Sequence, residues 1–392
     1  MTPNPISPDP YVTWAEIDLD AIAANVAAFR RHVGPTVQVI AVVKANAYGH
    51  GAAPVAEAAL QAGAARLAVH RAIEGVELRR AGIRAPILVM GYTPPAAGGT
   101  VVDWQLTPTV TTQEFARALS ARAAAAGREV PFHIKIDTGM SRYGLLPTEA
   151  VEFARALTAL PAIRLEGVFT HFATADAADQ THVREQLRIF NGVLDSLRAA
   201  RIEVPLAHAA NSAATMRLPE AHFNAVRPGI ALYGMDPSSE WPPVFPLARP
   251  LTLKSRVSRV RDLPAGAGIG YGRTHITARP TRAALVPVGY GDGYHRVLSN
   301  RGAVLVHGER APILGRVSMD QIVVDVTEIA GVQQDDEVVL VGRQGAAEIR
   351  AEEVAALAGT INYEVTTALL PRVTRIYFRN CVAVGLASLE EE

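Results

Sequence analysis

The chain has 392 residues, of which 49% are hydrophobic, and its 38 basic residues balance its 38 acidic residues. This length exceeds what one ordinary hydrophobic core fills, so two domains are expected. The balanced charge argues against nucleic acid or an anionic membrane as the main partner and favours a small neutral or zwitterionic substrate.

The N-terminal segment and the cysteine content indicate a cytoplasmic protein. Residues 1–14, MTPNPISPDPYVTW, have neither the basic nor the apolar region of a signal peptide. No uninterrupted apolar stretch is long enough to span a bilayer. The single cysteine, Cys381, excludes an internal disulfide and a thiolate metal cluster. No histidine or acidic cluster has metal-ligand spacing, so no bound metal is expected.

From residue 17 to about 240, short apolar runs alternate with helical segments. The first helix, DAIAANVAAFRRHVG, begins at Asp18 or Asp20 and ends at Gly34. Runs typical of buried strands follow at 37–45, 66–70, 85–91, 106–110, 132–137, 165–172, 205–210 and 224–229. Such strands joined by helices indicate a covered parallel sheet, and this number of them favours a (β/α)8 TIM-type barrel. An open dinucleotide-binding sheet is disfavoured, because no G-x-G-x-x-G follows the first strand.

A proline-rich segment at 235–250, MDPSSEWPPVFPLARP, interrupts this periodicity and predicts a domain boundary near residue 240. Strand-like alternation dominates residues 241–392, with one helical stretch, RAEEVAALAG. Residues 11–16 also alternate. We therefore predict a barrel over 17–240 and a mainly β C-terminal domain over 241–392, whose sheet residues 11–16 join.

Lysine is rare in this chain, which has only Lys44, Lys135 and Lys254. Arginine stays protonated, whereas lysine can lose its proton and act as a nucleophile or a base. Lysines retained in an arginine-rich chain are therefore candidates for amine chemistry. Lys254 is the exception, since it lies in an alternating, half-exposed run, LTLKSRVSRV, where chance retention is the simpler explanation.

Polar and reactive groups follow several of the predicted strands at the end that forms the catalytic face of a barrel. Each has an ordinary structural explanation, such as a core histidine or a local ion pair, but five strand ends together favour a site. Loops after the last two barrel strands often bind phosphate. A phosphate site beside a strand-end lysine predicts pyridoxal phosphate held as a Schiff base. The residues at these strand ends are Lys44, Lys135, Asp137, Arg142, His171, Asn211, Ser212, Arg227, Gly229 and Ile230.

Nine segments, in order from residue 41 to 365, resemble the signature segments of bacterial alanine racemases. The resemblance implies a barrel, a C-terminal β domain, a homodimer and pyridoxal 5′-phosphate. The implied activity is the interconversion of L- and D-alanine, which supplies D-alanine for peptidoglycan. Ser318 departs from the pattern, because many members have cysteine there. The segments are AVVKANAYGHG, KIDTGMSRYG, HFATAD, HAANS, VRPGIALYG, GIGYGRTH, PVGYGDGY, GRVSMDQ and INYEV.

The resemblance also implies residue roles. Lys44 would hold the cofactor and act as the base for D-alanine, and Tyr271 of the other subunit would be the base for L-alanine. Arg142 and the backbone of Met319, the latter also across the interface, would bind the substrate carboxylate. The remaining implied positions are Tyr48, Asn211, Ser212, Gly229, Ile230 and Tyr363 with the cofactor and its phosphate, His171 beside the ring, Arg227 facing the pyridine nitrogen, Lys135 as a carbamate that orients Arg142, and Tyr290 and Arg296 at the substrate entrance.

Three other functions remain open at this point. A pyridoxal-dependent decarboxylase of the same architecture is opposed by Arg227, where an acidic residue is expected, and by the absence of a suitable cysteine. A non-catalytic pyridoxal phosphate-binding barrel is opposed by the whole C-terminal domain. A racemase for serine or a broader substrate set is not excluded, because one methylene changes binding by only about 1–3 kcal/mol.

Overall fold

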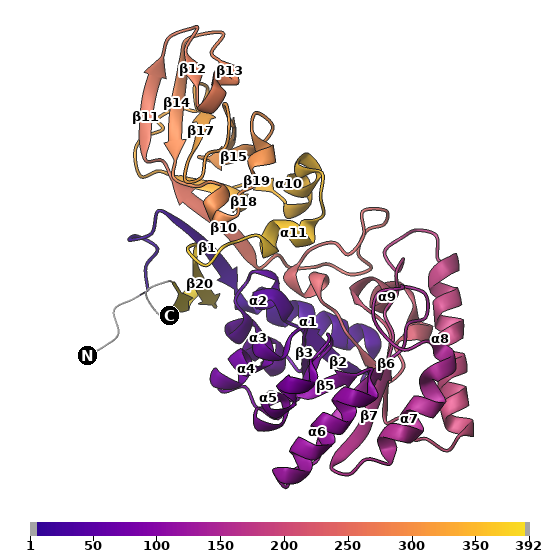
Figure 1. Ribbon diagram of the computed structural model, residues 1–392. Coiled ribbons are helices and arrows are strands. Elements are labelled where there is room, and N and C mark those ends of the chain that lie inside the picture. Colours follow the sequence, from indigo (N-terminus) through magenta and orange to yellow (C-terminus); the bar gives the residue numbers. More distant parts are fainter. Residues whose placement is uncertain (1–5, 389–392) are drawn as a thin grey trace. The chain divides into compact units, whose positions relative to one another are not determined.

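The structure is a computed structural model that describes residues 6–388 (Figure 1). The chain divides into two compact units. The barrel unit comprises Ile22–Ala47 and Ala52–Ala248. The sheet unit comprises the N-terminal residues up to Ala21, the short segment Tyr48–Gly51 and the chain from Arg249 onward.

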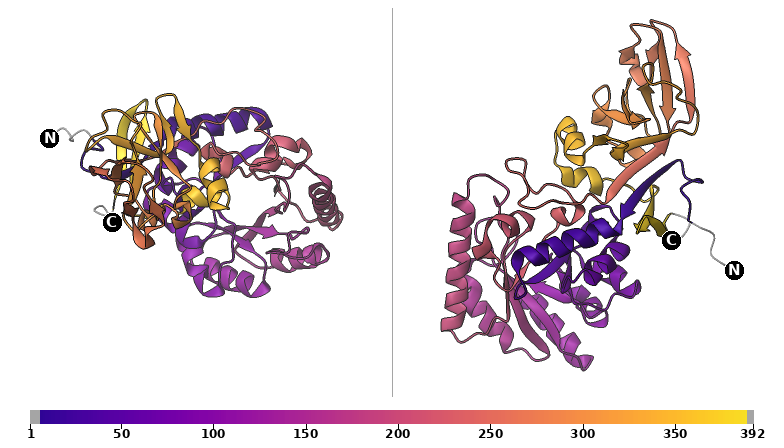
Figure 2. Two further views of the ribbon diagram at one scale, coloured as in Figure 1. Left: turned by 90° about the horizontal axis from the view of Figure 1, so that it is seen from above. Right: turned by 180° about the vertical axis from the view of Figure 1, so that it is seen from behind.

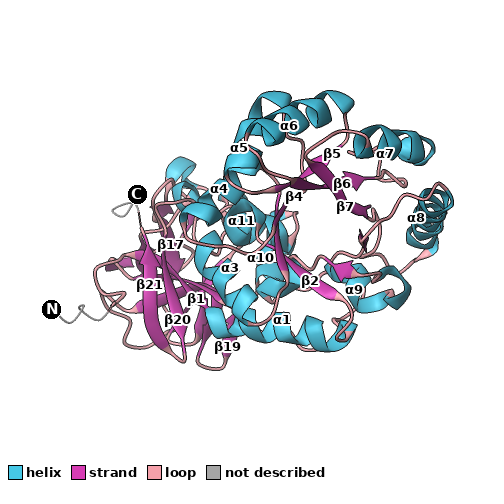
Figure 3. Cartoon of the chain, turned by 90° about the horizontal axis from the view of Figure 1, so that it is seen from below, coloured by secondary structure: helices cyan, strands magenta, loops and turns pink. Residues whose placement is uncertain are grey.

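The barrel unit is built on eight parallel strands that close in chain order, which confirms the predicted (β/α)8 barrel. Helices surround the strands, as Figure 3 shows along the barrel and Figure 2 from two further sides. The strands are β2 (Gln38–Val42), β3 (Arg66–Val69), β4 (Ile87–Val89), β5 (Thr107–Val110), β6 (Val130–Lys135), β7 (Ile163–Phe169), β8 (Leu206–His208) and β9 (Ala225–Val226). The helices are α1 (Leu19–Val33), α3 (Ala52–Gln61), α4 (Ala72–Arg80), α5 (Gly98–Asp103), α6 (Gln113–Ala125), α7 (Ala150–Thr158), α8 (Thr181–Ala199) and α9 (Ser212–Arg217).

Helix α1 begins and ends where its sequence signals lie. The Asp18 carboxylate accepts hydrogen bonds from the backbone N–H groups of Asp20 (2.9 Å) and Ala21 (3.1 Å), which have no partner within the helix. Gly34 follows the last helical residue with a φ of 81°, the left-handed conformation that glycine adopts without steric cost. The alternating apolar positions of the strands are almost fully buried, as close packing inside a barrel requires.

The sheet unit is mainly β, as predicted. Its largest sheet has the order β16-β15-β18-β10-β1-β20-β21, and β19 pairs with β18. Smaller sheets contain β11-β14-β17 and β12-β13. The strands are β1 (Thr13–Asp18), β10 (Leu251–Arg256), β11 (Arg259–Leu263), β12 (Gly268–Ile269), β13 (His275–Ile276), β14 (Thr281–Val286), β15 (Ala303–Val306), β16 (Glu309–Pro312), β17 (Ile322–Asp325), β18 (Glu337–Gln344), β19 (Ala347–Ile349), β20 (Thr374–Arg379) and β21 (Val382–Ala387).

Residues near the N-terminus lie in the middle of this sheet. Strand β1 pairs antiparallel with β10 and parallel with β20. Two helices accompany the sheets: α10 (Ala351–Ala358), in the predicted helical stretch, and α11 (Asn362–Thr367), which sequence periodicity did not predict. Among residues 6–388 no helix is long and apolar enough to cross a membrane.

Lys254, for which the sequence favoured chance retention, has a structural role as a cation between strands. Its ammonium lies 3.0 Å from carboxylate oxygens of both Glu16 on β1 and Glu337 on β18. Burial alone would lower the pKa of Lys254, but the two carboxylates outweigh it and the pKa is raised. This lysine is held as a cation between strands and is not available for amine chemistry.

Candidate active site

A left-handed turn follows the first barrel strand. The segment α2 (Lys44–Tyr48) has φ values of 52°, 52°, 51° and 54° from Ala45 to Tyr48. Each such non-glycine residue costs roughly 1–2 kcal/mol, so surrounding bonds must hold the turn. The Ala45 N–H donates to the Glu74 carboxylate (2.6 Å) on α4, and the Ala52 N–H donates to the Asn46 side chain (2.7 Å). The strained backbone begins directly after Lys44, two residues beyond the end of β2.

The amine of Lys44 has an altered acidity. Burial and the Arg142 guanidinium lower the pKa of Lys44, against the Glu74 carboxylate, which raises it. A lowered pKa makes the neutral, nucleophilic amine more accessible at neutral pH. This lowered pKa suits the amine chemistry for which the scarcity of lysine made Lys44 a candidate.

Lys135 ends β6 and is buried. Burial, with the charges of Arg142 and Arg227, lowers the pKa of Lys135 to about 8. Its ammonium lies 5.1 Å from the centre of the Tyr143 ring and 5.6 Å from that of Phe169. Among residues 6–388 it forms no ion pair, so an ordinary pairing with Asp137 does not account for it.

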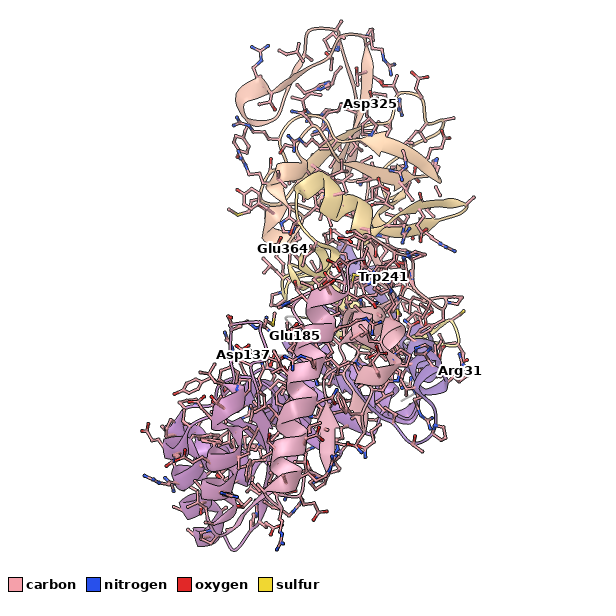
Figure 4. The ribbon with its side chains drawn as sticks, turned by 90° about the vertical axis from the view of Figure 1, so that its right-hand side faces the viewer. Arg31, Asp137, Glu185, Trp241, Asp325 and Glu364 are labelled. Carbon is pink, nitrogen blue, oxygen red and sulfur yellow. The ribbon has the colours of Figure 1, made fainter. Side chains whose placement is uncertain are left out.

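Asp137, whose side chain is labelled in Figure 4, instead organises the loop that carries Arg142. Its carboxylate accepts backbone N–H groups from Gly139 (3.0 Å), Met140 (2.9 Å), Ser141 (3.0 Å) and Arg142 (3.0 Å). Burial would raise the pKa of Asp137, but these four donors lower it. The ionised carboxylate fixes the backbone of the loop and leaves the Arg142 guanidinium exposed.

Arg227 follows β9 and is only 3% exposed. Its guanidinium donates to the carbonyl oxygens of Thr170 (2.7 Å) and Ala209 (2.9 Å) and to Nδ1 of His208 (2.6 Å). Burial lowers the pKa of Arg227 to about 9, which leaves it a cation at neutral pH. The group is rigidly placed between the ends of β7, β8 and β9.

His171 lies beside this guanidinium, with Nδ1 3.5 Å from the Arg227 Nη2. Burial, together with the charges of Arg227 and Lys135, holds the pKa of His171 well below its usual value. The imidazole is therefore neutral at physiological pH, and a neutral ring can pack against another planar group without a charge penalty.

The residues after β8 and β9 also come together. The Ser212 hydroxyl accepts a hydrogen bond from the Gly229 N–H (2.8 Å), and Ile230 begins the short helix η4 (Ile230–Tyr233). Asn211 caps α9 by accepting the Ala214 N–H (2.9 Å). The strand ends that carry Lys44, Lys135, Ser212 and Arg227 thus belong to one face of the barrel.

The remaining predicted site residues belong to the sheet unit. The rings of Tyr48 and Tyr363 lie 6.1 Å apart between centres. Tyr290 lies next to Met319. The Tyr290 N–H donates to the Ser318 carbonyl oxygen (3.1 Å), and the N–H of the following residue, Gly291, donates to the Met319 carbonyl oxygen (2.8 Å). Tyr271, on η5 (Tyr271–Arg273), is 71% exposed, and Met319 is 52% exposed. Arg296 begins a separate short helix, η7 (Arg296–Leu298).

Two family models match nearly all of the chain. The model described as alanine racemase, N-terminal domain, matches residues 17–237, and the one described as alanine racemase, C-terminal domain, matches residues 250–377. The chain belongs to the alanine racemase family.

Curated relatives and solved structures support the same family assignment. The alanine racemase of Halothermothrix orenii is 46% identical over 93% of this chain and 96% of that protein. That of Desulforamulus reducens is 47% identical over 93% of this chain and 98% of its own length. The crystal structure of alanine racemase from Bacillus anthracis with bound L-Ala-P is 40% identical, covers 97% of this chain and 98% of that one, and has a TM-score of 0.92. The predicted family, fold and class of enzyme, a racemase, are confirmed.

Sequence analysis of this alanine racemase family member did not single out several buried polar groups around Arg227. His208 contacts Arg227 directly, and His133 contacts His208 at 2.8 Å between ring nitrogens. Phe169 stacks on the His208 ring with centres 4.8 Å apart. A signal was present for His133, which lies two residues before Lys135 and so on the same strand face.

Proposed function

We propose that this enzyme interconverts L- and D-alanine with pyridoxal 5′-phosphate as cofactor. The observation that carries the proposal is Lys44, an amine of lowered pKa at the catalytic end of the barrel, among the cations Lys135, Arg142 and Arg227. The mutual effects of these charges on each other's pKa support a site with excess positive charge. Such a site fits an anionic cofactor and a substrate carboxylate.

The residues fit this cofactor. The Lys44 amine would hold it, and Arg227 would face the ring nitrogen with His171 beside the ring. The phosphate would be held by Ser212, Gly229 and Ile230, with Asn211, Tyr48 and Tyr363 as the further cofactor-binding residues. When bound, pyridoxal phosphate supplies an electron sink for the charge left when the substrate Cα loses its proton.

Racemisation needs two bases, one on each face of the substrate. The Lys44 amine would take or return the proton for D-alanine, and the Tyr271 phenol would do so for L-alanine. A phenol with an ordinary pKa of ~10 needs positive charge nearby to act as a base, and the cationic barrel site would supply it. The high exposure of Tyr271 and Met319 supports their use in the site of a second subunit, in a homodimer.

The substrate carboxylate would be bound by the Arg142 guanidinium and the backbone N–H of Met319. Lys135 suits a carbamate, because carbon dioxide adds to the neutral amine with loss of one proton and a pKa of about 8 makes that form accessible. The anion formed would orient Arg142 by charge. Tyr290 and Arg296 would lie at the substrate entrance.

We also propose a cytoplasmic location and, from the family resemblance, supply of D-alanine for peptidoglycan as the role. A serine racemase is the second candidate, since the residues that bind the carboxylate would serve any amino acid. A decarboxylase remains disfavoured by the buried cation Arg227.

The test is to incubate the purified protein and cofactor with either enantiomer of alanine or serine and to resolve the products by chiral chromatography. We expect approach to an equal mixture from both alanine enantiomers, slower turnover of serine, and no turnover by Lys44→Ala. Release of carbon dioxide, or no change in either alanine enantiomer, would contradict the proposal.

A further inference from the structure

A row of polar side chains runs through the interior of the barrel from Arg227 toward the opposite end. The His208 Nε2 lies 2.8 Å from the His133 Nδ1, and the His133 Nε2 lies 3.1 Å from the Glu166 carboxylate. That carboxylate also forms a bidentate ion pair with Arg66, whose Nη1 and Nη2 donate to its two oxygens at 2.7 and 3.1 Å. His133 and His208 are both fully buried.

The direction of every hydrogen bond in this row follows from its two ends. A guanidinium can only donate, so the Nδ1 of His208 must accept from Arg227. His208 is then neutral, carries its proton on Nε2 and donates it to the His133 Nδ1. His133 in turn is neutral and donates from Nε2 to the ionised Glu166. One tautomer of each histidine satisfies all the contacts, and the reverse tautomers place two donors face to face.

The barrel is locally adapted to hold this row. A Cβ on Gly167 would lie 2.8 Å from the His133 Nδ1, so glycine makes room for the ring. The pairing of β6 with β7 skips Glu166, because Phe132 pairs with Leu165 and His133 with Gly167. Such a bulge re-aims a side chain, here the carboxylate that meets His133. Burial would raise the pKa of Glu166, but His133 and Arg66 lower it to about 2, so it is ionised at working pH.

We propose that His133 and Glu166 are positioning residues that hold His208 in its Nε2–H tautomer and thereby fix the Arg227 guanidinium. We call this control of the His208 tautomer the tautomer lock. The effect of the lock on catalysis rests on the proposed function of Arg227, whereas the lock itself does not. Neither residue touches the reacting atoms, and both act through His208.

The test is Glu166→Gln in the full-length protein, with nitrogen-15 histidine spectra as the first readout. In the native protein both rings should show a proton on Nε2 and an accepting Nδ1. In Glu166→Gln, either orientation of the amide places its NH2 group against an Arg66 donor, so neither orientation is strongly favoured. In the orientation that turns the NH2 group toward His133, the His133 Nε2 must accept, and its proton must move to Nδ1. We therefore expect a second population of His208 and His133 with the proton on Nδ1, and Glu166→Asp, which keeps the charge, should restore the native pattern.

Glu129→Gln is the matched control. Glu129 is a carboxylate at the same end of the barrel, paired with Arg164 at 3.0 Å but outside the row, so its spectra should be native. In the racemase assay, Glu166→Gln should lower kcat about ten-fold with little change in KM, and the control should not.

Each outcome bears on one claim. Native histidine tautomers in Glu166→Gln, or an Nδ1 proton on His208 in the native protein, would overturn the lock. Altered tautomers with unchanged kcat would overturn its catalytic effect. Absence of racemisation in the native protein would refute the proposed function and leave the spectral result standing.

Discussion

Arg227 is the residue whose charge most constrains the chemistry of this barrel. It is a buried cation bonded to two carbonyl oxygens and a histidine, and a guanidinium cannot hand a proton to a ring nitrogen beside it at neutral pH. The ring nitrogen would therefore stay unprotonated, and the cofactor would delocalise less of the negative charge from Cα. This favours return of the proton to Cα over its delivery to the cofactor. Sequence predicted the position of Arg227, but not the buried partners that fix its orientation.

Arg227→Glu should raise the ratio of transamination to racemisation, because a carboxyl group can share a proton with the ring nitrogen. Pyruvate formed per racemisation event measures this ratio. Arg227→Lys, which keeps the positive charge, should leave the ratio low even if its turnover falls. An unchanged ratio of transamination to racemisation in a folded Arg227→Glu protein would contradict this role of the Arg227 charge.

Lys135 predicts a pH dependence of stability. Its pKa is about 8 in the folded protein and ~10.4 when unfolded, so between these values the unfolded chain binds more protons and stability rises with pH. The full effect is about 3 kcal/mol. Arg227 and Lys44 also have lowered pKa values, so stability should rise with pH both in the native protein and in Lys135→Met. In buffers free of carbon dioxide, the rise should be larger in the native protein by the contribution of Lys135. Parallel curves for both proteins from pH 8 to 10.5 would contradict the lowered pKa.

At the scale of elements, the alternation of apolar and helical segments located all the barrel strands, because burial on both faces leaves a clear apolar signal. The ends of the strands were predicted less well. The first run was expected to reach residue 45, but β2 ends at Val42 and the chain enters the left-handed turn α2. That turn depends on Glu74 from a later helix, a long-range contact that local sequence does not encode. Helix α11 was missed because it spans only six residues.

Gly49, directly after this turn, shows how closely elements approach in the sheet unit. Its φ is 87°, and a Cβ there would lie 2.0 Å from the Thr366 carbonyl oxygen of α11. Gly34 has a similar φ of 81° with nothing within 4 Å, so it controls for the backbone conformation alone. Gly34→Ala should cost about 1 kcal/mol, and Gly49→Ala clearly more, since the backbone must also move. Thermal unfolding measures both, and equal losses would argue against the close approach.

At the scale of the whole molecule, the predicted site residues are divided between two units. Those of the barrel unit come together at one end of its strands, whereas Tyr271 and Met319 are exposed on the sheet unit. The strand ends predicted the barrel residues without the family resemblance. Tyr271 and Met319 were named only through that resemblance, because no local pattern indicates that a residue serves another subunit. The proposed homodimer explains why large side chains of this kind are exposed.

Mixing Lys44→Ala with Tyr271→Phe subunits tests the shared site. Neither variant should racemise alanine alone. In a hybrid dimer one site would have both substitutions and the other neither, so about half of the hybrid sites should regain activity. Recovery should require refolding or exchange of subunits, and mixing without exchange is the control. No recovery in verified hybrid dimers would place Lys44 and Tyr271 of one site on the same chain.

The identity of the lysine that holds the cofactor is the central claim, and one measurement addresses it directly. Borohydride reduction of the protein with pyridoxal phosphate fixes the cofactor on that lysine, and peptide mass mapping then locates the added mass among the three lysines of the chain. The mass should appear on the peptide that contains Lys44 and disappear in Lys44→Ala. Its appearance on Lys135 or Lys254, or on no lysine, would contradict the account.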